Sequence, residues 1–350
     1  MINFSKFNSI ISLTSYFTSD AKCMQAIIES RWGVGEQQDV VCPYCGKHHC
    51  KMSKNGRFHC TQCNCNFSCL VETMFENTKL PLIKWFVAMY LISSHKKGIS
   101  SHQLSRDLDI TQATAWHMLH KIRKFYAQSD AEAFEGTVEC DEVYIGGKEK
   151  WKHKSMKTPH TQGRSTKTKT PVFGMMERST IVDETTGEIE NITYVHAFAV
   201  ENTNRATLQP IIQQFVADGS RVITDELQAY NGLDTLGYTH EVVKHGEEQY
   251  ANGDVFTNSI EGFWAHFKRV IFSTYHMVSK DYLQRYIDEQ VYRWNTRKEN
   301  AEFRFEDMFK RAVKSFDYAD VLKMSTSVDI VTWKIKHDSY YWARNIKNAS

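Results

Sequence analysis

Two pairs of cysteines form the plainest chemical motif of this 350-residue chain. Each pair has the spacing Cys-x-x-Cys, Cys42 with Cys45 and Cys60 with Cys63, and fourteen residues separate the pairs. This is close to the spacing of a four-cysteine zinc site, in which each turn presents two thiolates to one tetrahedral ion. Since four protein ligands leave no open position for water, the pattern predicts one structural Zn²⁺ rather than a catalytic one.

The stretch between the cysteine pairs predicts a β-hairpin, and with the thiolates a zinc ribbon. Residues 51–58 read KMSKNGRF, and the dipeptide Asn55-Gly56 favours a tight turn. A disulfide framework is the alternative, but the N-terminus does not read as a secretion signal. Further cysteines and histidines could compete for the ion, namely Cys50, Cys65, Cys69, His48, His49 and His59.

A second set of side chains could bind metal through oxygen. Asp141 lies mid-way along an apolar stretch, Asp225 ends another, and Glu261 lies in a later amphipathic stretch. An acid inside an apolar strand is costly unless it is paired or bound to metal. Three converging carboxylates would repel one another, and two Mg²⁺ (or Mn²⁺) ions would relieve that repulsion and form a phosphoryl-transfer site. For any one acid alone, a strand end or a helix cap is the simpler explanation.

The predicted elements around these acids follow a known order. Strands are predicted over 137–145, 172–179, 192–200, 221–225 and 240–245, with a hairpin turn at 183–188. Helices are predicted over 206–217 and 230–236 and from Thr257 onward. The order β-β-β-α-β-α-β-α is that of an α/β, ribonuclease-H-like mixed sheet, in which the three carboxylates would converge at one edge.

A helix-turn-helix is predicted between the cysteines and the strands. Residues 80–94 form an apolar helix, and residues 98–125 hold two short helices, capped by Ser100 or Ser101 and by Thr111. Next to a zinc ribbon this pattern favours DNA binding over an ordinary helical hairpin. The side chains expected near DNA are Gln112, Thr114, Trp116, His117 and Lys121.

The near-neutral net charge of +2 hides an uneven distribution. Residues 1–130 carry +6, residues 131–260 carry −8 and residues 261–350 carry +4. Within the acidic middle part, residues 144–170 hold eight basic residues and a single acid. This loop could contact a polyanion beside the acids, the alternative being a loop that only increases solubility. The lysines expected to make the contact are Lys148, Lys150, Lys152 and Lys154.

Composition excludes several classes of protein. With 41% hydrophobic and 13% aromatic residues, the chain can bury a sizeable core, which excludes global disorder. No run of about 18 apolar residues occurs, so neither a membrane-spanning helix nor a membrane partner is expected. We expect four regions: the zinc ribbon at 20–75, the helix-turn-helix at 80–128, the α/β domain at 132–300 and a helical tail of unassigned role at 301–350.

Three blocks of this sequence resemble a known family. They are VECDEVYIGGKE (138–149), VITDELQAYNGL (222–233) and a long block that begins FTNSIEGFWAHFK and ends VYRWNTR (256–297). In this order they resemble bacterial insertion-sequence transposases of the DDE class. The most similar group is the ISXO2-like one, which has an N-terminal zinc ribbon and is related to Merlin transposons. The resemblance runs from about Asp20 to Arg304.

The resemblance implies a DNA transposase that cleaves and joins strands at transposon ends, with water and then the freed 3′-hydroxyl as nucleophiles. It implies that Asp141, Asp225 and Glu261 are catalytic ligands of the Mg²⁺ ions. Thirty-five residues separate Asp225 from Glu261, an interval that many such transposases show. Some members are described with Asn as the third residue. Asn258 is therefore the alternative, since it precedes Glu261 by three residues on the same helix.

The resemblance also implies contacts with DNA. Lys268 follows Glu261 by seven residues, two turns along one helix face, and suits a DNA phosphate. Arg269 beside it is assigned a DNA contact as well. We expect transposon ends and target DNA as partners, a homodimer or higher multimer on DNA, and a cytoplasmic, nucleoid-associated location in a bacterium.

Two other functions stay open. One is a DNA-binding regulator that keeps the ribbon and the helix-turn-helix but has lost the chemistry. The presence of all three acids argues against it, since drift would be expected to replace at least one. The other is a nuclease or resolvase of the same fold without strand transfer. The ribbon and helix-turn-helix suit recognition of specific ends, which favours the transposase.

Overall fold

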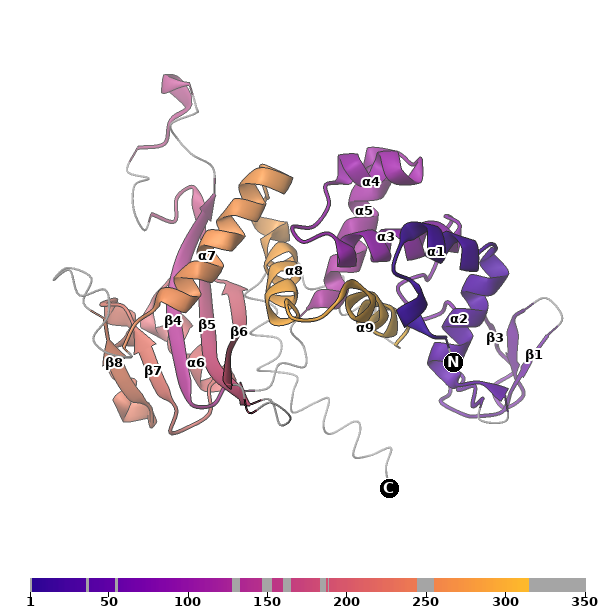
Figure 1. Ribbon diagram of the computed structural model, residues 1–350, viewed down its shortest axis with the longest axis horizontal. Helices are drawn as coiled ribbons and strands as arrows, with labels where there is room; N and C mark the ends of the chain where they lie inside the picture. Colours follow the sequence, from indigo (N-terminus) through magenta and orange to yellow (C-terminus); the bar gives the residue numbers. More distant parts are fainter. Residues whose placement is uncertain are drawn as a thin grey trace. The chain divides into compact units, whose positions relative to one another are not determined.

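The chain forms two compact units. One contains the chain up to Tyr126 together with the segment from Thr296 onward that includes α9, and the other contains Ala127–Asn295 (Figure 1). The computed structural model describes residues 2–35, 38–53, 56–127, 133–146, 153–159, 165–182, 187, 189–243 and 255–314. Asn55 of the predicted ribbon turn and most of the predicted 183–188 turn lie outside these residues.

The first unit is built around one apolar helix, α3 (Leu82–Ser94). Ten of its 13 residues are buried, because apolar side chains occupy all of its faces. Its Phe86 ring lies 4.8 Å from that of Phe17 and 5.3 Å from that of Phe309, measured between centroids. The helices that pack against α3 are α1 (Ile10–Tyr16), α2 (Asp20–Trp32), α4 (Ser101–Leu108), α5 (Gln112–Arg123) and α9 (Ala301–Val313).

The described part of the C-terminal region is α9, and it belongs to the core of this first unit. Besides its contact with α3, its Ala312 carbonyl accepts a hydrogen bond from the Met74 N–H at 2.9 Å. Two 3₁₀ turns, η1 (Phe4–Lys6) and η3 (Lys124–Tyr126), also contact it. A segment distant in sequence thus completes the unit that contains the ribbon.

Local capping signals set the boundaries of α4 and α5. Ser100 Oγ accepts from the Gln103 N–H at 3.2 Å, and Thr111 Oγ1 accepts from the Thr114 N–H at 3.3 Å, so caps at Ser100 and Thr111 are confirmed. Between the helices, Asp109 adopts a φ of +49° and turns the chain. Six apolar residues of the two helices are buried, and Ile110 in the turn is half-buried. The buried residues are Leu104, Leu108, Ala115, Met118, Leu119 and Ile122.

The cysteine-rich segment forms a small antiparallel sheet, β1 (Cys50–Met52), β2 (Phe58–Cys60) and β3 (Asn66–Phe67). Cys50 pairs with Cys60 in the register of β1 with β2, so the predicted hairpin is confirmed. Its apolar support is limited to a few aromatic rings. Phe58 and Phe67 stack with centroids 5.5 Å apart, and the Trp32 ring lies 5.0 Å from Phe58.

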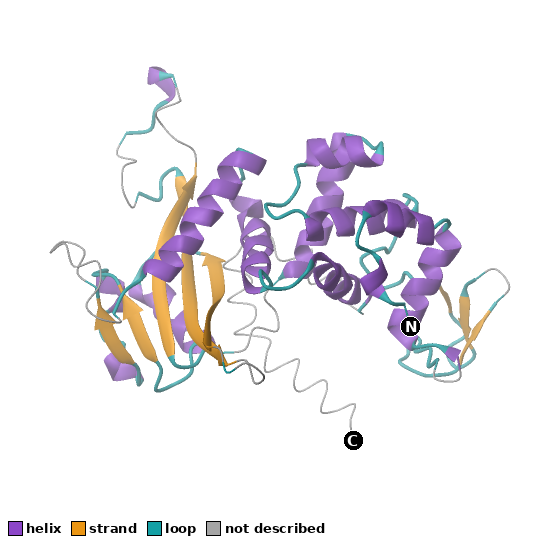
Figure 2. Cartoon of the chain, viewed as in Figure 1, coloured by secondary structure: helices purple, strands orange, loops and turns teal. Residues whose placement is uncertain are grey.

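The second unit contains a five-stranded mixed sheet with helices on both faces (Figure 2). The strand order is β6-β5-β4-β7-β8, with β6, β5 and β4 antiparallel and β7 and β8 parallel to β4. The strands are β4 (Thr137–Gly146), β5 (Lys169–Val182), β6 (Ile189–Ala199), β7 (Arg221–Thr224) and β8 (Thr239–Val242).

Residues alternate between the two faces of β4, and this alternation assigns each helix its side. Val138 and Cys140 belong to the core that α6 (Arg205–Phe215) covers. Val143 and Ile145 belong to the opposite core, which α7 (Asn258–Val270) and α8 (Leu283–Asn295) cover. Asp141 precedes Val143 by two residues on the strand, so its side chain lies on the same face, the one that α7 covers.

Two side-chain amides of α8 protect the open edge of β6. Gln284 accepts from the Ala199 N–H at 2.8 Å and donates to the Ala197 carbonyl at 3.2 Å. Asn295 accepts from the Val195 N–H at 2.9 Å and donates to the same residue's carbonyl at 3.0 Å. Because the amides replace a neighbouring strand from Val195 to Ala199, this part of the edge is not open to pairing with another chain.

The predicted helix over 230–236 is wrong. The chain there forms two 3₁₀ turns, η6 (Gln228–Tyr230) and η7 (Asp234–Leu236). Gly232 lies between them at a φ of +85°, which interrupts a helix. The order in this unit is therefore three strands, α6, β7, two 3₁₀ turns, β8, α7 and α8.

The remaining differences from prediction lie at element ends. β8 ends at Val242, earlier than predicted, and residues 244–245 lie outside the described chain. Beyond α7 the chain continues into a π-helical turn, η9 (Ile271–Tyr275), and a 3₁₀ turn, η10 (Lys280–Tyr282). The basic loop after β4 includes a short 3₁₀ turn, η5 (Lys154–Met156).

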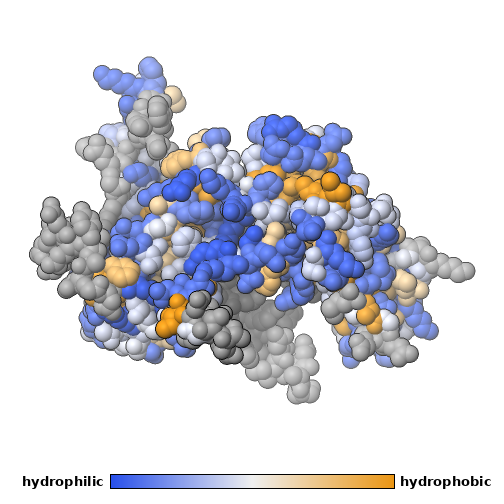
Figure 3. All heavy atoms as spheres, viewed as in Figure 1, coloured by the Kyte–Doolittle hydropathy of each residue, from blue (hydrophilic) through white to orange (hydrophobic). Residues whose placement is uncertain are grey.

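Hydrophilic residues predominate on the face drawn in Figure 3, and hydrophobic residues there gather in separate patches. Among the described residues, no helix has the length and apolar character that crossing a membrane requires.

A substitution at Gly174 tests how α7 packs against the sheet. It pairs with Asp141 across β4 and β5, and an added Cβ would lie 2.4 Å from Cζ2 of Trp264 in α7. We expect Gly174→Ala to lower the free energy of unfolding by about 1–3 kcal/mol, because the ring must move. Gly262→Ala is the control: its Cβ would meet nothing within 4 Å. It should stabilise α7 by up to about 1 kcal/mol. Urea unfolding measures both, and an unchanged Gly174→Ala protein would contradict this packing.

Candidate active site and metal centre

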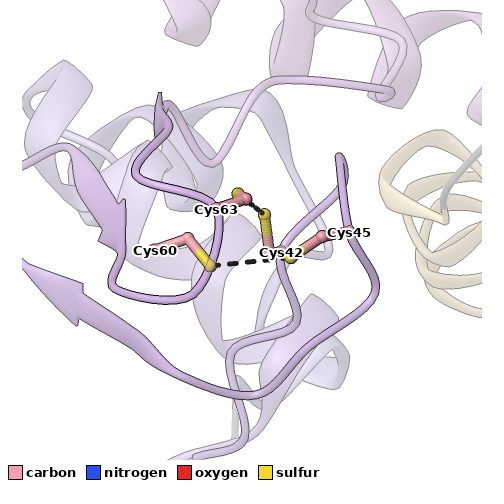
Figure 4. Close-up of side chains that lie close together, drawn as sticks. All are labelled: Cys42, Cys45, Cys60 and Cys63. Atoms are coloured by element: carbon pink, nitrogen blue, oxygen red, sulfur yellow. Dashed lines mark hydrogen bonds between the residues drawn. The ribbon is translucent and has the colours of Figure 1, made fainter.

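Four cysteine thiols converge in the first unit (Figure 4). The Sγ atoms of Cys42 and Cys63 are 3.6 Å apart, as are those of Cys45 and Cys60, and all four lie within 4.8 Å of one another. Sulfurs about 2.3 Å from a tetrahedral zinc ion would lie about 3.8 Å from each other. The four side chains that the spacing predicts therefore fit Zn²⁺.

Backbone groups shape the two cysteine turns. The Gly46 N–H donates to the Cys42 carbonyl at 2.9 Å, with Gly46 at a φ of +67°. At the other turn, the backbone N–H of Cys63, with that of Gln62, lowers the pKa of Cys60, while the pKa of Cys45 and of Cys63 in the same cluster is raised by burial and by the neighbouring thiols. The thiolate form, which binds metal, is thus most favoured at Cys60.

The competing ligands do not join this cluster. His48 Nδ1 lies 2.6 Å from Asp39 Oδ1, and His59 Nδ1 lies 3.1 Å from Asn66 Oδ1. None of the nine cysteines forms a disulfide, which argues against a disulfide framework.

Asp141 is a half-buried carboxylate with acidic neighbours. Burial is the main cause that raises its pKa to about 7, and the charge of Glu142 adds to the effect. The charges of Asp225 and Glu261 raise it further. Carboxylates from the end of β7 and from α7 are thus close enough to Asp141 of β4 to disfavour its ionisation.

The strand register explains why two of these acids meet. Thr137 of β4 pairs with Arg221 of β7 and Glu139 pairs with Ile223, so the continued register brings Asp141 opposite Asp225. Asp225 directly follows β7, and its Oδ1 accepts from the Leu227 N–H at 2.9 Å. This bond closes an Asx turn directly after the strand, so Asp225 also has the strand-ending role that remained open for an isolated acid.

Glu261 approaches from the first turn of α7, where it is exposed. Its Oε1 accepts from Thr257 Oγ1 at 3.4 Å. Asn258 begins the same helix and is exposed, and Lys268 and Arg269 are exposed in its last turn. In the described part of the chain, only the four cysteines form a metal-ligand group within 4.8 Å, so the three acids are less closely grouped.

Two family models match the chain: an ISXO2-like transposase domain over residues 133–295 and a transposase zinc-ribbon domain over residues 18–66. A transposase-like protein of Haemophilus influenzae is 31% identical over 121 residues, 34% of this chain and 94% of that protein. The chain belongs to the ISXO2-like transposase family. A protein in transposable element ISH50 of Halobacterium salinarum is 28% identical over 286 residues, 77% of this chain and 89% of that protein.

The ribbon match and the four-cysteine cluster together support a structural zinc ion in this member of the transposase family. Among solved structures, a chain in a pre-cleavage Mos1 transpososome is 14% identical with a TM-score of 0.21, covering 62% of this chain and 75% of that one. A score this low carries no argument about the fold.

The predicted DNA contacts on α5 differ in their surroundings. Gln112 Nε2 donates to Ser101 Oγ at 2.8 Å, which links the starts of α4 and α5. The Thr114 hydroxyl lies 2.8 Å from that of Thr111. His117 is exposed on α5.

The lysines predicted to contact DNA lie in different surroundings. Lys121 Nζ donates to the Glu76 carbonyl at 3.2 Å and lies 5.6 Å from the Trp85 ring centroid. Burial lowers the pKa of Lys121, and these contacts favour a packing role for it. Lys154 is exposed in η5. The predicted contacts outside the described residues are Lys148, Lys150 and Lys152.

The sequence interpretation missed a buried ion pair, Glu139 with Arg178. A signal was present, because Glu139 precedes Asp141 by two residues and so lies on the same face of an apolar strand. A carboxylate there needs a partner. The partner, 39 residues away, could not be chosen from the chain alone.

The zinc assignment makes a direct prediction. Cys60→Ser should abolish binding of the one zinc ion per chain and unfold the ribbon, since its folding energy depends on the metal. Cys65→Ser is the matched control from outside the cluster and should retain zinc. Zinc content after dialysis measures both. Loss of zinc from Cys65→Ser with retention in Cys60→Ser would show that the ligand set is wrong.

The raised pKa of Asp141 makes a second prediction. Because its native pKa of about 7 exceeds the value of about 4 in an unfolded chain, its ionisation destabilises the fold as pH rises between these values. Without added Mg²⁺ or Mn²⁺, Asp141→Asn should therefore raise the free energy of unfolding by about 1–2 kcal/mol at pH 8. The gain should shrink towards pH 5. Thermal unfolding at both pH values measures this, and an equal or larger gain at pH 5 would contradict it.

Proposed function

We propose that this protein is a DNA transposase that binds the ends of an insertion sequence and catalyses metal-dependent strand cleavage and strand transfer. The observation that carries the proposal is the placement of Asp225, at the end of β7, and of Glu261, in the first turn of α7, as charged neighbours of Asp141, within the region that matches the ISXO2-like transposase domain. The strand order, with three antiparallel strands followed by two parallel ones, supports a ribonuclease-H-like fold for this domain.

Mg²⁺ or Mn²⁺ suits this set of side chains. All three acids offer hard oxygen ligands, and burial together with repulsion by acidic neighbours raises the pKa of Asp141, a combination that bound cations offset. Asp141, Asp225 and Glu261 would hold two ions, which supply activation of the attacking hydroxyl and stabilisation of the leaving oxygen. Glu261 is preferred to Asn258 as the third ligand because it carries charge.

The remaining residues of α7 suit the substrate. Asn258, one turn before Glu261, can orient a phosphate oxygen through its amide. Lys268 lies two turns after Glu261 on the same face, and its ammonium can hold a DNA phosphate with the help of Arg269. Lysines of the basic loop, including Lys154, add to this attraction, so binding should weaken steeply with salt.

End recognition is assigned to the first unit. In this proposal α4 and α5 form the helix-turn-helix, with Gln112, Thr114 and His117 near DNA, and the zinc ribbon precedes them in the chain. The protein acts as a homodimer or higher multimer on transposon ends and target DNA, in the bacterial cytoplasm.

A strand-transfer assay tests this function. Zinc-loaded protein, Mg²⁺, labelled ends from the DNA that flanks the gene, and target DNA should give joined products. Glu261→Gln should reduce joining at least about a hundredfold, because a lost ligand removes several kcal/mol of transition-state stabilisation. Asn258→Ala should reduce it about tenfold, as expected for a group outside the ligand set. A larger loss of joining in Asn258→Ala than in Glu261→Gln would instead identify Asn258 as the third ligand.

The products also distinguish the other functions. Binding of ends without cleavage would indicate a regulator, and cleavage without joining would indicate a nuclease. Full joining by Asp225→Asn would contradict the site.

A further inference from the structure

The ion pair of Glu139 and Arg178 joins the central strand to its neighbour. Arg178 Nε donates to Glu139 Oε1 at 2.5 Å, and the Glu139 side chain is 0% exposed against 19% for Arg178. Arg178 of β5 pairs in register with Thr137, two residues before Glu139 on β4. Both charged side chains therefore lie on the sheet face that α7 covers.

The same two side chains bond the start of α7. Glu139 Oε2 accepts from the Ile260 N–H at 3.0 Å, and Arg178 Nη2 donates to the Phe256 carbonyl. The Arg178 guanidinium also lies 3.6 Å from the centroid of the Phe256 ring. The pair thus contacts the chain on both sides of Asn258, where the helix begins.

Glu139 takes the place of a local helix cap. Thr257, at the N-cap position, makes no side-chain cap hydrogen bond, and its hydroxyl donates to Glu261 instead. The first turn of a helix has unpaired N–H groups and a partial positive charge, so a carboxylate there is favourable. That carboxylate comes from β4, so the cap also ties the helix to the strand.

These contacts form a short path between two of the proposed metal ligands. Glu139 precedes Asp141 by two residues on the same face of β4, and Ile260 directly precedes Glu261. We propose that Glu139 and Arg178 are positioning residues, which fix the first turn of α7 against β4 and so set the separation of Asp141 and Glu261. The inference rests on the proposed function, since it assigns these acids a shared metal site.

A buried ion pair suits positioning better than it suits stability. Apolar residues of similar volume are often at least as stabilising, whereas charged hydrogen-bonded partners allow fewer alignments of a helix on a strand. Stability and positioning can therefore be separated by substitution. Replacing both partners removes the alignment without leaving one charge buried alone.

Binding of Mn²⁺ alone provides a readout that does not need catalysis. Zinc-loaded Glu139→Gln should bind Mn²⁺ about 10- to 100-fold more weakly than wild type, the range for groups that orient metal ligands. Its kcat for joining should fall by a similar factor, with KM for DNA ends unchanged. The double variant Glu139→Gln with Arg178→Met should regain the thermal stability that Glu139→Gln loses, but not the Mn²⁺ affinity.

A purely structural pair gives a different result. Mn²⁺ affinity would then recover together with thermal stability in the double variant, which would overturn the inference. Unchanged Mn²⁺ affinity in Glu139→Gln would do so as well. Leu208→Ala, in the α6 core on the other sheet face, is the control that should lower the unfolding temperature without altering Mn²⁺ affinity. Wild-type protein that binds Mn²⁺ but joins no DNA would instead overturn the proposed function.

Discussion

An ionised carboxylate that leaves water costs several kcal/mol, and β4 carries two acids, Glu139 and Asp141, on one face of a buried strand. The two acids differ in the neighbouring groups that offset this desolvation cost. Glu139 has a guanidinium and a helix N–H as partners, Arg178 and Ile260. Asp141 is partly buried and has further acids among its neighbours, so its pKa is raised. The first acid aligns α7 on the strand, and the second remains a carboxyl group whose ionisation a bound cation would favour.

The rest of the sheet is compatible with this constraint. α7 must approach β4 and β5 closely, and Gly174, opposite Asp141, leaves the space that the Trp264 ring occupies. The opposite face, under α6, is covered by a mainly apolar core, in which the Tyr230 hydroxyl donates to Glu142 Oε2 at 2.8 Å. α8 closes the β6 edge through Gln284 and Asn295.

The ribbon of the first unit has the opposite problem, since it buries too little. Its three strands are two or three residues long and rest on a few aromatic rings, which is insufficient for an independent sheet. Four thiolates around one zinc ion supply the missing folding energy. The two units therefore use metal for different purposes: structure in the first and, as we propose, chemistry in the second.

Short-range features were readable from the sequence alone. The zinc ligands, the caps at Ser100 and Thr111 and the ribbon hairpin depend on spacing within one segment, where local geometry leaves few alternatives. The predicted helix over 230–236 failed because one glycine, Gly232, adopts a positive φ that composition alone does not reveal. Only the tertiary structure decided which charge compensates Glu139 and which helix it caps. Those partners lie 39 and 121 residues away, and they meet through sheet register and helix packing rather than through any local pattern.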